Sequence, residues 1–336
     1  MITVNNFTFV VLTYNHANYI LEHLESVKYL IENHADGIAV EIIVADDASR
    51  DGTVALTKSW LDQNSYLFRR VIIVSDGINR GTCKNLTRAI GYLATDYCKI
   101  TAGDDVYSYE NLFTEVENIK DNHILSGLPL NLINGTIVDT QFDLFNLFAT
   151  NIIYEKTPYL TRLKRINFFN SPSVVYAVSA LWNKEVKSFV DRYSVTEDYP
   201  LQIKMAELYT PLKFVQVEKI FVYYRRTANS TYLVRSSQFD RDKVDIFNYL
   251  IKSERSIFGK LLLRNRLFCY NLKNRYLKKA FNLSFYLYGF GILTNIVFIL
   301  NKVRKFDTQS YRHQSHYDFI TLRARNHYTD YIKLEV

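Results

Sequence analysis

The sequence predicts an α/β protein with a Rossmann-like, mostly parallel sheet flanked by helices, followed by a mainly helical, basic C-terminal region. Three observations lead to this fold class. Short apolar runs alternate with helical patterns over residues 1–125, acidic pairs follow two of these runs, and basic residues are concentrated in residues 241–279. The chain has 336 residues, of which 48% are hydrophobic, so it can form a sizeable core and is not globally disordered.

Residues 7–12 form an apolar run in which Thr8 is the only polar residue, which is typical of a strand that is buried on both faces of a parallel sheet. The further strands expected in the first segment cover residues 40–45, 71–74 and 97–101, and the helices between them cover residues 19–33, 53–61 and 83–93. Strands that alternate with helices predict crossover connections and a doubly wound sheet. We expect this unit to span residues 1–125.

Residues 126–235 form the second expected segment, and their pattern is mixed. Gly127-Leu128-Pro129 combines glycine with proline, so we interpret it as a loop or turn. The elements expected in this segment are strands at residues 174–177, 214–217 and 220–224 and a helix at residues 199–208.

Residues 236–336 form the third expected segment, which is helical and basic within a chain of net charge +7. The uncharged stretch 280–301 is long enough to cross a bilayer, but polar residues and two glycines dilute it. Three alternatives are open: it lies on a membrane, crosses one, or packs in a soluble core or against a second copy of the chain. We expect peripheral membrane contact through residues 241–305, since no nucleic-acid-binding motif accompanies the positive charge.

Several other functional classes lose support. No G-x-G-x-x-G or G-x-x-x-x-G-K-[ST] motif follows the first strand, which disfavours dehydrogenases and P-loop enzymes. The three cysteines show neither disulfide nor metal spacing, so we expect each to be buried in a reducing cytoplasm. His313 and His316 are interpreted as part of a surface tail rather than as zinc ligands. The N-terminus lacks the pattern of a secretory signal peptide, so we expect a cytoplasmic protein at the inner face of the cell membrane.

Three acidic pairs are the candidate functional residues. Asp46-Asp47 and Asp104-Asp105 each follow an expected strand, and Glu197-Asp198 lies further along the chain. Carboxylates at the end of an apolar strand are costly unless a cation or a hydrogen-bond donor meets them. Ligands of open α/β sheets bind outside the carboxyl ends of the strands, so we expect the first two pairs to border a ligand and the third to take part in chemistry.

The order of these motifs resembles that of family 2 glycosyltransferases of the GT-A fold. The segments that carry the resemblance are Thr13-Tyr14-Asn15, the run Asp46-Asp47-Ala48-Ser49-Arg50-Asp51-Gly52-Thr53, Asn79-Arg80-Gly81, Gly103-Asp104-Asp105 and Thr196-Glu197-Asp198. The resemblance covers residues 5–230, and the tail beyond residue 235 matches no family motif. It implies a nucleotide-sugar-binding half in residues 1–125 and an acceptor-binding half, with the catalytic base, in residues 126–235.

The resemblance implies that Asp46 or Asp47 contacts the base of the nucleotide. Carboxylates there can accept hydrogen bonds from a base N–H or from ribose hydroxyls, and Thr13 and Tyr14 can add a hydroxyl and a stacking face. The remaining residues that we assign to nucleotide binding are Asn15, Asn79 and Gly81. The alternative is that the two aspartates only cap the following helix or organise a turn.

Gly103-Asp104-Asp105 occupies the place of the metal-binding D-x-D motif of the family. Its carboxylates suit Mg²⁺ or Mn²⁺, which bridge to diphosphate oxygens. Ala102 stands where the first aspartate of that motif often occurs, so one ligand is lost or replaced. Which of Asp104 and Asp105 binds the metal is open, and an acidic turn without metal is the alternative.

Glu197-Asp198 resembles the acidic pair that precedes the acceptor helix of the family. The resemblance implies that Asp198 is the catalytic base of an inverting transfer and that Glu197 orients the acceptor. An ordinary helix N-terminus, where acidic residues are favourable, is the alternative. Arg225 and Arg226 follow the last expected strand and are candidates for diphosphate binding, with a solvated strand end as the alternative.

Together these features predict an inverting, metal-dependent glycosyltransferase. We expect it to move a sugar from a UDP-sugar to a hydroxyl of a glycan or lipid-linked glycan in cell-surface polysaccharide synthesis. One alternative is a non-catalytic nucleotide-sugar-binding or membrane scaffold protein with a degenerate site, which the missing aspartate at Ala102 favours. A nucleotidyltransferase is less well supported, because no glycine-rich loop with Lys or Arg follows the first strand.

Overall fold

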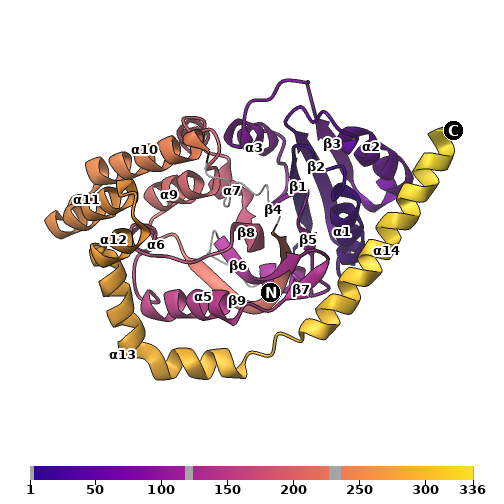
Figure 1. Cartoon of the computed structure of the whole chain (residues 1–336). Helices are drawn as coiled ribbons and strands as arrows, with labels where there is room; N and C mark the ends of the chain where they lie inside the picture. Colours follow the sequence, from indigo (N-terminus) through magenta and orange to yellow (C-terminus); the bar gives the residue numbers. More distant parts are fainter. Residues whose placement is uncertain (1–3, 118–123, 227–235, 336) are drawn as a thin grey trace.

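The computed structural model describes residues 4–117, 124–226 and 236–335, and its centre is one mixed sheet (Figure 1). The strands lie in the order β3-β2-β1-β4-β8-β6-β9-β5, and β7 pairs with β6. Their bounds are β1 (Asn6–Thr13), β2 (Ala39–Asp46), β3 (Arg70–Val74), β4 (Tyr97–Ala102), β5 (Val106–Tyr107), β6 (Ile124–Ile133), β7 (Thr136–Val138), β8 (Val174–Ala177) and β9 (Phe214–Arg225).

The first unit of the chain is the parallel part of this sheet, as the alternating pattern predicts. Strands β3, β2, β1 and β4 are parallel neighbours, and α1 (Ile20–His34), α2 (Thr53–Asn64) and α3 (Thr82–Ile90) connect them. Thr13 pairs with Asp46 in register, and Leu12 pairs with Ala102. The motifs that follow these strands therefore meet at one edge, the carboxyl edge of the sheet.

Both faces of the parallel strands are covered, which explains their continuous apolar runs. Phe7 and Phe9 of β1 belong to the core that includes α1 and α2. Val10 and Leu12 belong to the opposite core, with α3, α8 (Lys184–Val190) and α9 (Asp198–Leu208). The three cysteines are buried, as expected.

The second segment differs from its prediction. Gly127-Leu128-Pro129 is not a turn but part of β6, and the two strands expected at residues 214–217 and 220–224 are one strand, β9. The β6–β9 register shifts on both sides of Leu128, which accommodates the irregularity. A side chain at Gly127 would lie 2.4 Å from the ring of Phe221, so glycine allows the close approach of β9.

The expected division between residues 125 and 126 falls inside β6, and the sheet continues across it. The sequence prediction also missed β5, β7 and several helices between residues 1 and 235. These helices are α4 (Phe113–Val116), α5 (Gln141–Ile153), α6 (Tyr159–Leu163) and α7 (Val178–Leu181), besides α8 and the 3₁₀ turns η1 (Ser65–Leu67) and η2 (Ser171–Ser173).

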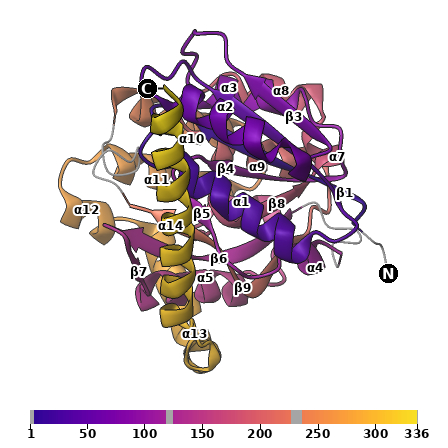
Figure 2. The same ribbon diagram turned by 90° about the vertical axis from the view of Figure 1, so that its right-hand side faces the viewer.

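The C-terminal region is helical, as predicted. It consists of α10 (Ser237–Ser253), α11 (Ile257–Asn271), α12 (Arg275–Ala280), α13 (Leu283–Lys305) and α14 (Ser310–Glu335). Helix α10 packs beside α9, α13 bends around the end of the molecule against α5, and α14 runs along the outer side of α1 (Figures 1 and 2). The region therefore wraps around the sheet domain.

The interpretation of His313 and His316 as part of a surface tail is wrong. Both imidazoles are buried where α14 meets β9, and their Nδ1 atoms lie 2.8 and 3.1 Å from the hydroxyl of Tyr223. Burial, and then the neighbouring His313, lower the pKa of His316 to about 3. Apolar neighbours such as Ile320 on the same helix pack into the core with them, which the sequence spacing did not reveal.

Candidate active site at the carboxyl edge of the sheet

Asp46 lies at the end of β2 and is held by its own neighbourhood. Its carboxylate accepts hydrogen bonds from the hydroxyl of Thr13 at 3.0 Å, from the backbone N–H of Ser49 at 2.9 Å and from the hydroxyl of Ser49. The hydroxyl of Ser75 lies 3.4 Å away. Asp46 is almost completely buried, so it shapes the turn after β2 and joins that turn to the end of β1.

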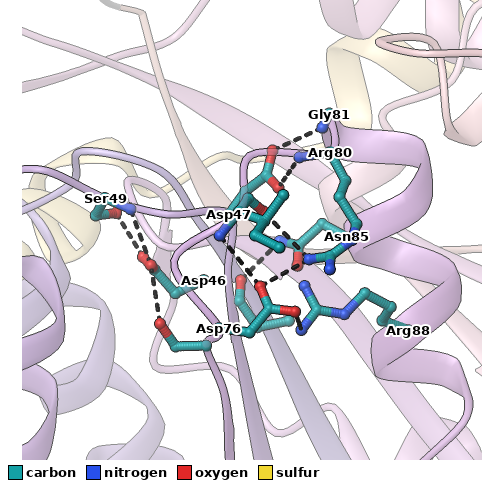
Figure 3. Close-up of polar contacts among 11 residues, drawn as sticks. Asp46, Asp47, Ser49, Asp76, Arg80, Gly81, Asn85 and Arg88 are labelled. Atoms are coloured by element: carbon teal, nitrogen blue, oxygen red, sulfur yellow. Dashed lines mark hydrogen bonds and ion pairs between the residues drawn. The ribbon is translucent and has the colours of Figure 1, made fainter.

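Asp47 holds the loop that precedes α3. Its two carboxylate oxygens accept the backbone N–H groups of Arg80 at 2.7 Å and of Gly81 at 2.9 Å, and Figure 3 shows them pointing toward these nitrogens. Beside this loop, Asp76 forms ion pairs with Arg80 at 2.7 Å and with Arg88 at 3.1 Å. The predicted nucleotide residues after β2 and before α3 are therefore one connected structure.

Both aspartates organise turns, which agrees with the alternative that the sequence left open; their contact with a nucleotide stays a prediction. Asn15 adds to the same structure, because its side-chain oxygen accepts the backbone N–H of Arg50 at 2.8 Å. Tyr14 is 45% exposed and Asn79 is exposed, so both side chains are open to solvent at this edge. A flat aromatic side chain at that position is available for stacking.

Asp104 and Asp105 form the turn after β4 and differ in burial. Asp105 is 1% exposed; one carboxylate oxygen accepts the backbone N–H of Arg225 at 2.9 Å, and the other is buried without a hydrogen-bond partner. Burial, and then the charge of Asp104, raise the pKa of Asp105 well above its usual range. Asp104 is half-buried. The pair therefore offers one unsatisfied buried oxygen and one carboxylate that reaches the surface.

Arg225 supports this acidic turn from the end of β9. Its Nε donates to the carbonyl oxygen of Asp104 at 2.6 Å, and its guanidinium forms an ion pair with Glu22 of α1. Tyr317 of α14 donates to the same Glu22 carboxylate at 3.0 Å. Arg225 is buried and engaged in these contacts, and its predicted diphosphate contact stays a prediction.

Arg226 points away from Arg225. Its Nε donates to the side-chain oxygen of Asn131 at 2.9 Å, its guanidinium lies 3.7 Å from Asp143, and it stacks over the ring of Tyr224 at 4.6 Å. These contacts tie β9 to β6 and α5. Arg226 would have to break them to reach a diphosphate, so its predicted diphosphate contact stays a prediction.

Glu197 and Asp198 lie at the N-terminus of α9. Both are half-buried, and the carboxylate of Asp198 accepts its neighbour's backbone N–H, that of Tyr199, at 2.6 Å. Burial, and then the charge of Asp198, raise the pKa of Glu197 to about 8. A carboxyl group whose pKa is raised this far is mostly protonated at neutral pH.

Two observations relate the positions of the acidic pairs to one another. The charges of Asp105, Asp104 and Asp198 all act on the hydroxyl of Tyr224, whose pKa burial and these charges raise. In the loop before α3, a side chain at Gly81 would lie 2.8 Å from the carbonyl oxygen of Ser194, in the loop before Glu197. The loop of the third pair therefore touches the loop that Asp47 holds.

The sequence reading missed the residues that support these pairs. No sequence motif marks Tyr224 or Glu22, although Tyr224 directly precedes Arg225 and Arg226. His16 follows Asn15 and lies beside Gly103, where a side chain would approach its ring to 3.2 Å; its Nδ1 atom is buried and lacks a hydrogen-bond partner. The sequence did offer one signal for His16, because it directly follows the Thr13-Tyr14-Asn15 motif.

Comparison with protein families supports the resemblance. A family model described as "Glycosyl transferase family 2" matches residues 8–183, which is more than half of the chain. The match includes β2, which ends at Asp46, and the turn after β4 that contains Asp104, and it ends before Glu197 and Asp198.

The chain is also similar to individual proteins. It is 30% identical over 105 residues to the abequosyltransferase RfbV of Salmonella typhimurium, a stretch that covers 31% of this chain and 30% of that protein. Among solved structures, S. aureus TarS 1–349 in complex with UDP-GlcNAc gives a TM-score of 0.55 at 17% identity, with 91% of this chain and 89% of that chain covered.

The mannosyltransferase PcManGT from Pyrobaculum calidifontis, in complex with GDP-Man and Mn²⁺, gives a TM-score of 0.55 at 14% identity and covers 98% of this chain and 88% of that chain. At these identities the structures establish the shared fold, which confirms the predicted GT-A architecture with its helical C-terminal region. The family model adds the identity: the chain is a family 2 glycosyltransferase.

Proposed function

We propose that this family 2 glycosyltransferase catalyses an inverting, metal-dependent transfer of a sugar from a nucleotide-sugar to a hydroxyl group. The observation that carries the proposal is that the loop held by Asp47 contacts the loop before Glu197 through Gly81 and Ser194, while the charges of Asp104, Asp105 and Asp198 all act on Tyr224. One set of carboxylates then faces the donor, and another faces the acceptor.

We propose a UDP-sugar as the donor. Thr13, Asp46 and Asp47 border the site at the ends of β1 and β2, and Tyr14 supplies an exposed ring beside them. TarS has been crystallised with UDP-GlcNAc, which agrees with this choice, whereas PcManGT has been crystallised with GDP-Man. Binding experiments with UDP and GDP therefore have to decide which nucleotide base the site prefers.

The acidic turn after β4 fits a divalent cation. Asp105 has a buried carboxylate oxygen without a partner, and the nearby Asp104 adds a second hard oxygen donor. Within the described ranges 4–117, 124–226 and 236–335, no group of three or more His, Cys, Asp or Glu side chains is placed to hold a metal. Two carboxylates suit Mg²⁺ or Mn²⁺, which keep waters and take phosphate oxygens as further ligands. Such an ion would offset the negative charge of the leaving diphosphate.

We assign Asp198 as the base that accepts the proton of the acceptor hydroxyl while that oxygen bonds to the anomeric carbon and the bond to the diphosphate breaks. Glu197, whose pKa is raised to about 8, holds a proton at neutral pH and can donate a hydrogen bond to the acceptor.

We propose a glycan or lipid-linked glycan as the acceptor and the inner face of the cell membrane as the place of action, within cell-surface polysaccharide synthesis. In the part of the chain that the structure describes, α13 is the one helix long and apolar enough to cross a membrane. It exposes a large apolar face, made up of Leu283, Phe285, Tyr286, Leu287, Phe290, Leu293, Val297, Phe298 and Leu300.

The contacts of α13 favour a helix that lies on the membrane over one that crosses it. Gly291 packs against Ile153 of α5, where an added side chain would lie 3.0 Å away, and the Tyr288 hydroxyl donates to the Asn146 side chain at 3.1 Å. One side of the helix is thus bound to the enzyme, while basic residues at its C-terminal end, such as Lys305, suit anionic headgroups. Association of two copies through the same face is the competing arrangement.

A non-catalytic nucleotide-sugar-binding protein is the second candidate. The observation in its favour is Ala102, together with the two-carboxylate composition of the turn. Glu197 and Asp198 argue against it, because a binder has no need for a half-buried acidic pair in which the pKa of one member, Glu197, is raised.

A thermal-shift experiment tests the donor and the metal. A ligand that binds only the folded state raises its stability by about 2.7 kcal/mol at 100 times Kd. We expect UDP with Mn²⁺ to raise the Tm, EDTA to remove most of the effect, and Asp104→Asn to weaken it without changing the Tm of the ligand-free protein. GDP is the comparison for the base. If no nucleoside diphosphate stabilises the chain with or without Mn²⁺, the proposal fails; stabilisation without any sugar release favours the non-catalytic binder.

A further inference from the structure

The loop before the acidic pair is held by one carboxylate from the C-terminal region. Oδ2 of Asp242 accepts hydrogen bonds from the backbone N–H groups of Ser194 at 2.9 Å, Val195 at 2.8 Å and Thr196 at 3.3 Å, and from the Thr196 hydroxyl at 3.0 Å. Oδ1 accepts from the side-chain amide of Gln238 at 3.0 Å. Asp242 is 2% exposed, so these donors replace water around a buried charge.

Asp242 is not a cap of its own helix. The N-cap of α10 is Ser236, whose hydroxyl accepts the backbone N–H of Phe239. Successive backbone N–H groups that converge on one oxygen form an anion-binding nest, and here the anion is a side chain. Burial acts to raise the pKa of Asp242, but the hydrogen bonds from the loop outweigh it and lower the pKa below its ordinary value.

The opposite side of this loop contacts the donor side of the site. The carbonyl oxygen of Ser194 accepts the backbone N–H of Cys83 at 3.2 Å and lies against Gly81. Residues 194–196 are therefore fixed between α10 and the loop that Asp47 holds. Asp198 follows two residues later as the first residue of α9, so the position of its carboxylate depends on this loop.

The next residue of α10 faces the acidic pair. The ammonium group of Lys243 lies 4.9 Å from the ring centroid of Tyr199, and its charge acts on Asp198 and Glu197. Helix α10 thus supplies an anchor for the loop and a cation near the pair that the loop carries. Both residues lie beyond the segment that matches the family model.

We infer that Asp242 is a positioning residue for the proposed base Asp198, so that the C-terminal region is part of the catalytic apparatus. The expected effect of Asp242 on catalysis rests on the proposed function. The structural part of the inference, that Asp242 orders residues 194–196, does not depend on that function. Asp242 touches no reacting atom and acts through the loop alone.

Hydrogen–deuterium exchange of the full chain tests the structural content. In Asp242→Ala we expect the amides of residues 194–196 to exchange faster by about tenfold or more, because they lose hydrogen bonds to a charged acceptor. Asp245→Ala, which changes an exposed acid on the same helix, should leave this exchange unchanged. Asp242→Asn keeps one acceptor oxygen and should restore part of the protection; it also carries the test if Asp242→Ala does not fold.

Kinetics test the consequence. Misplacement of a reacting group by about 1 Å costs about 10²-fold in rate, so kcat for sugar release should fall by about 10- to 100-fold in Asp242→Ala, with partial rescue in Asp242→Asn. The Kd for UDP should stay at the parental value, because Asp47 still holds the donor loop. A purely structural defect would weaken UDP binding together with kcat.

The outcomes separate this inference from the proposed function. Parental exchange and parental kcat in both Asp242 variants would overturn the inference while leaving the proposed function intact. Parental activity in Asp198→Asn would overturn the proposed function, and the exchange result would still decide whether Asp242 orders the loop.

Discussion

Gly81 is the residue where the loop before α3, which we propose binds the donor, touches the loop that precedes Glu197. Its φ of +84° is in the region that favours glycine, and a side chain there would lie 2.8 Å from the Ser194 carbonyl oxygen. Gly77 is a matched control, since it has a φ of +73° and open space around its Cβ position. Both substitutions carry the backbone cost, and only Gly81→Ala adds the clash.

We therefore predict that Gly81→Ala lowers the free energy of unfolding by about 1–3 kcal/mol more than Gly77→Ala does. Urea denaturation of the two variants measures the difference. Equal losses would show that the two loops separate without cost, and the close contact between the donor and base loops would then have no energetic weight.

Glu197 makes a second prediction at the scale of one residue. The pKa of its carboxyl group is about 8 in the folded state and 4.5 ordinarily, so folding takes up a proton between these values. The sign follows from linkage: the contribution of Glu197 to stability is present below pH 4.5 and is lost as the pH rises toward 8.

Glu197→Gln removes this titration. We expect the variant to gain stability relative to the parent as the pH rises from about 5 to about 8, as measured by urea denaturation at several pH values. If the stability difference between variant and parent does not change with pH, Glu197 is not protonated in the folded enzyme.

The motif residues could be proposed from the sequence, whereas the residues that support them could not. Asp46 ends a predictable strand, Asp104 follows another, and Asp198 begins a predictable helix. Asp242 and Glu22 act through the folded chain, with partners 46 to 48 and 203 residues away, and no local pattern records such contacts.

At the scale of elements, α14 is docked on the sheet domain. Ile320 is fully buried in a core cluster with residues of β6 and β9, and Arg323 donates to Glu25 of α1 at 2.6 Å. Leu322 on the same helix is 58% exposed and provides the control.

Ile320→Ala should therefore cost about 2–5 kcal/mol, the usual range for a buried isoleucine. Leu322→Ala should stay within about 0.5 kcal/mol of the parent. Chemical denaturation of both variants decides the point, and equal effects would mean that α14 is not held by this core.

The elements that could be predicted are those with a regular period. Strands β1 to β4 are rich in apolar residues, because both of their faces are covered. Strand β6 was read as a turn because Gly127 and Pro129 are turn residues by local preference; the register shift and the approach of Phe221 are tertiary effects that override it.

At the scale of the whole molecule, the apolar face of α13 should decide membrane binding. We predict that the full chain floats with vesicles rich in phosphatidylglycerol and less with neutral phosphatidylcholine vesicles. The double substitution Leu293→Ser with Phe298→Ser should abolish flotation, because both side chains are largely exposed on α13.

Tyr66→Ser, which removes another exposed aromatic side chain from a 3₁₀ turn of the sheet domain, serves as the control and should float normally. Flotation that survives the double substitution would contradict the proposed membrane face. A change from dimer to monomer in the double variant, without any flotation of the parent, would show that α13 joins two copies of the chain.

The arrangement of the whole molecule explains why the role of the C-terminal region could not be predicted from its sequence. It matches no family motif, yet α10 anchors the loop of the proposed base, and Tyr317 of α14 holds the Glu22–Arg225 support of the acidic turn. Its composition indicated a basic helical region, and only the fold places it around the site.

The central claim is that Asp198 removes a proton at the carboxyl edge while the donor is held independently of it. The most direct measurement is the rate of slow UDP-sugar hydrolysis, in which water replaces the acceptor. Proton NMR monitors this reaction and gives both its rate and the anomeric configuration of the released sugar. We predict that the parent releases the inverted sugar and that Asp198→Asn is slower by about 10²-fold or more with unchanged UDP affinity. A retained anomer, or a variant as fast as the parent, would contradict the account.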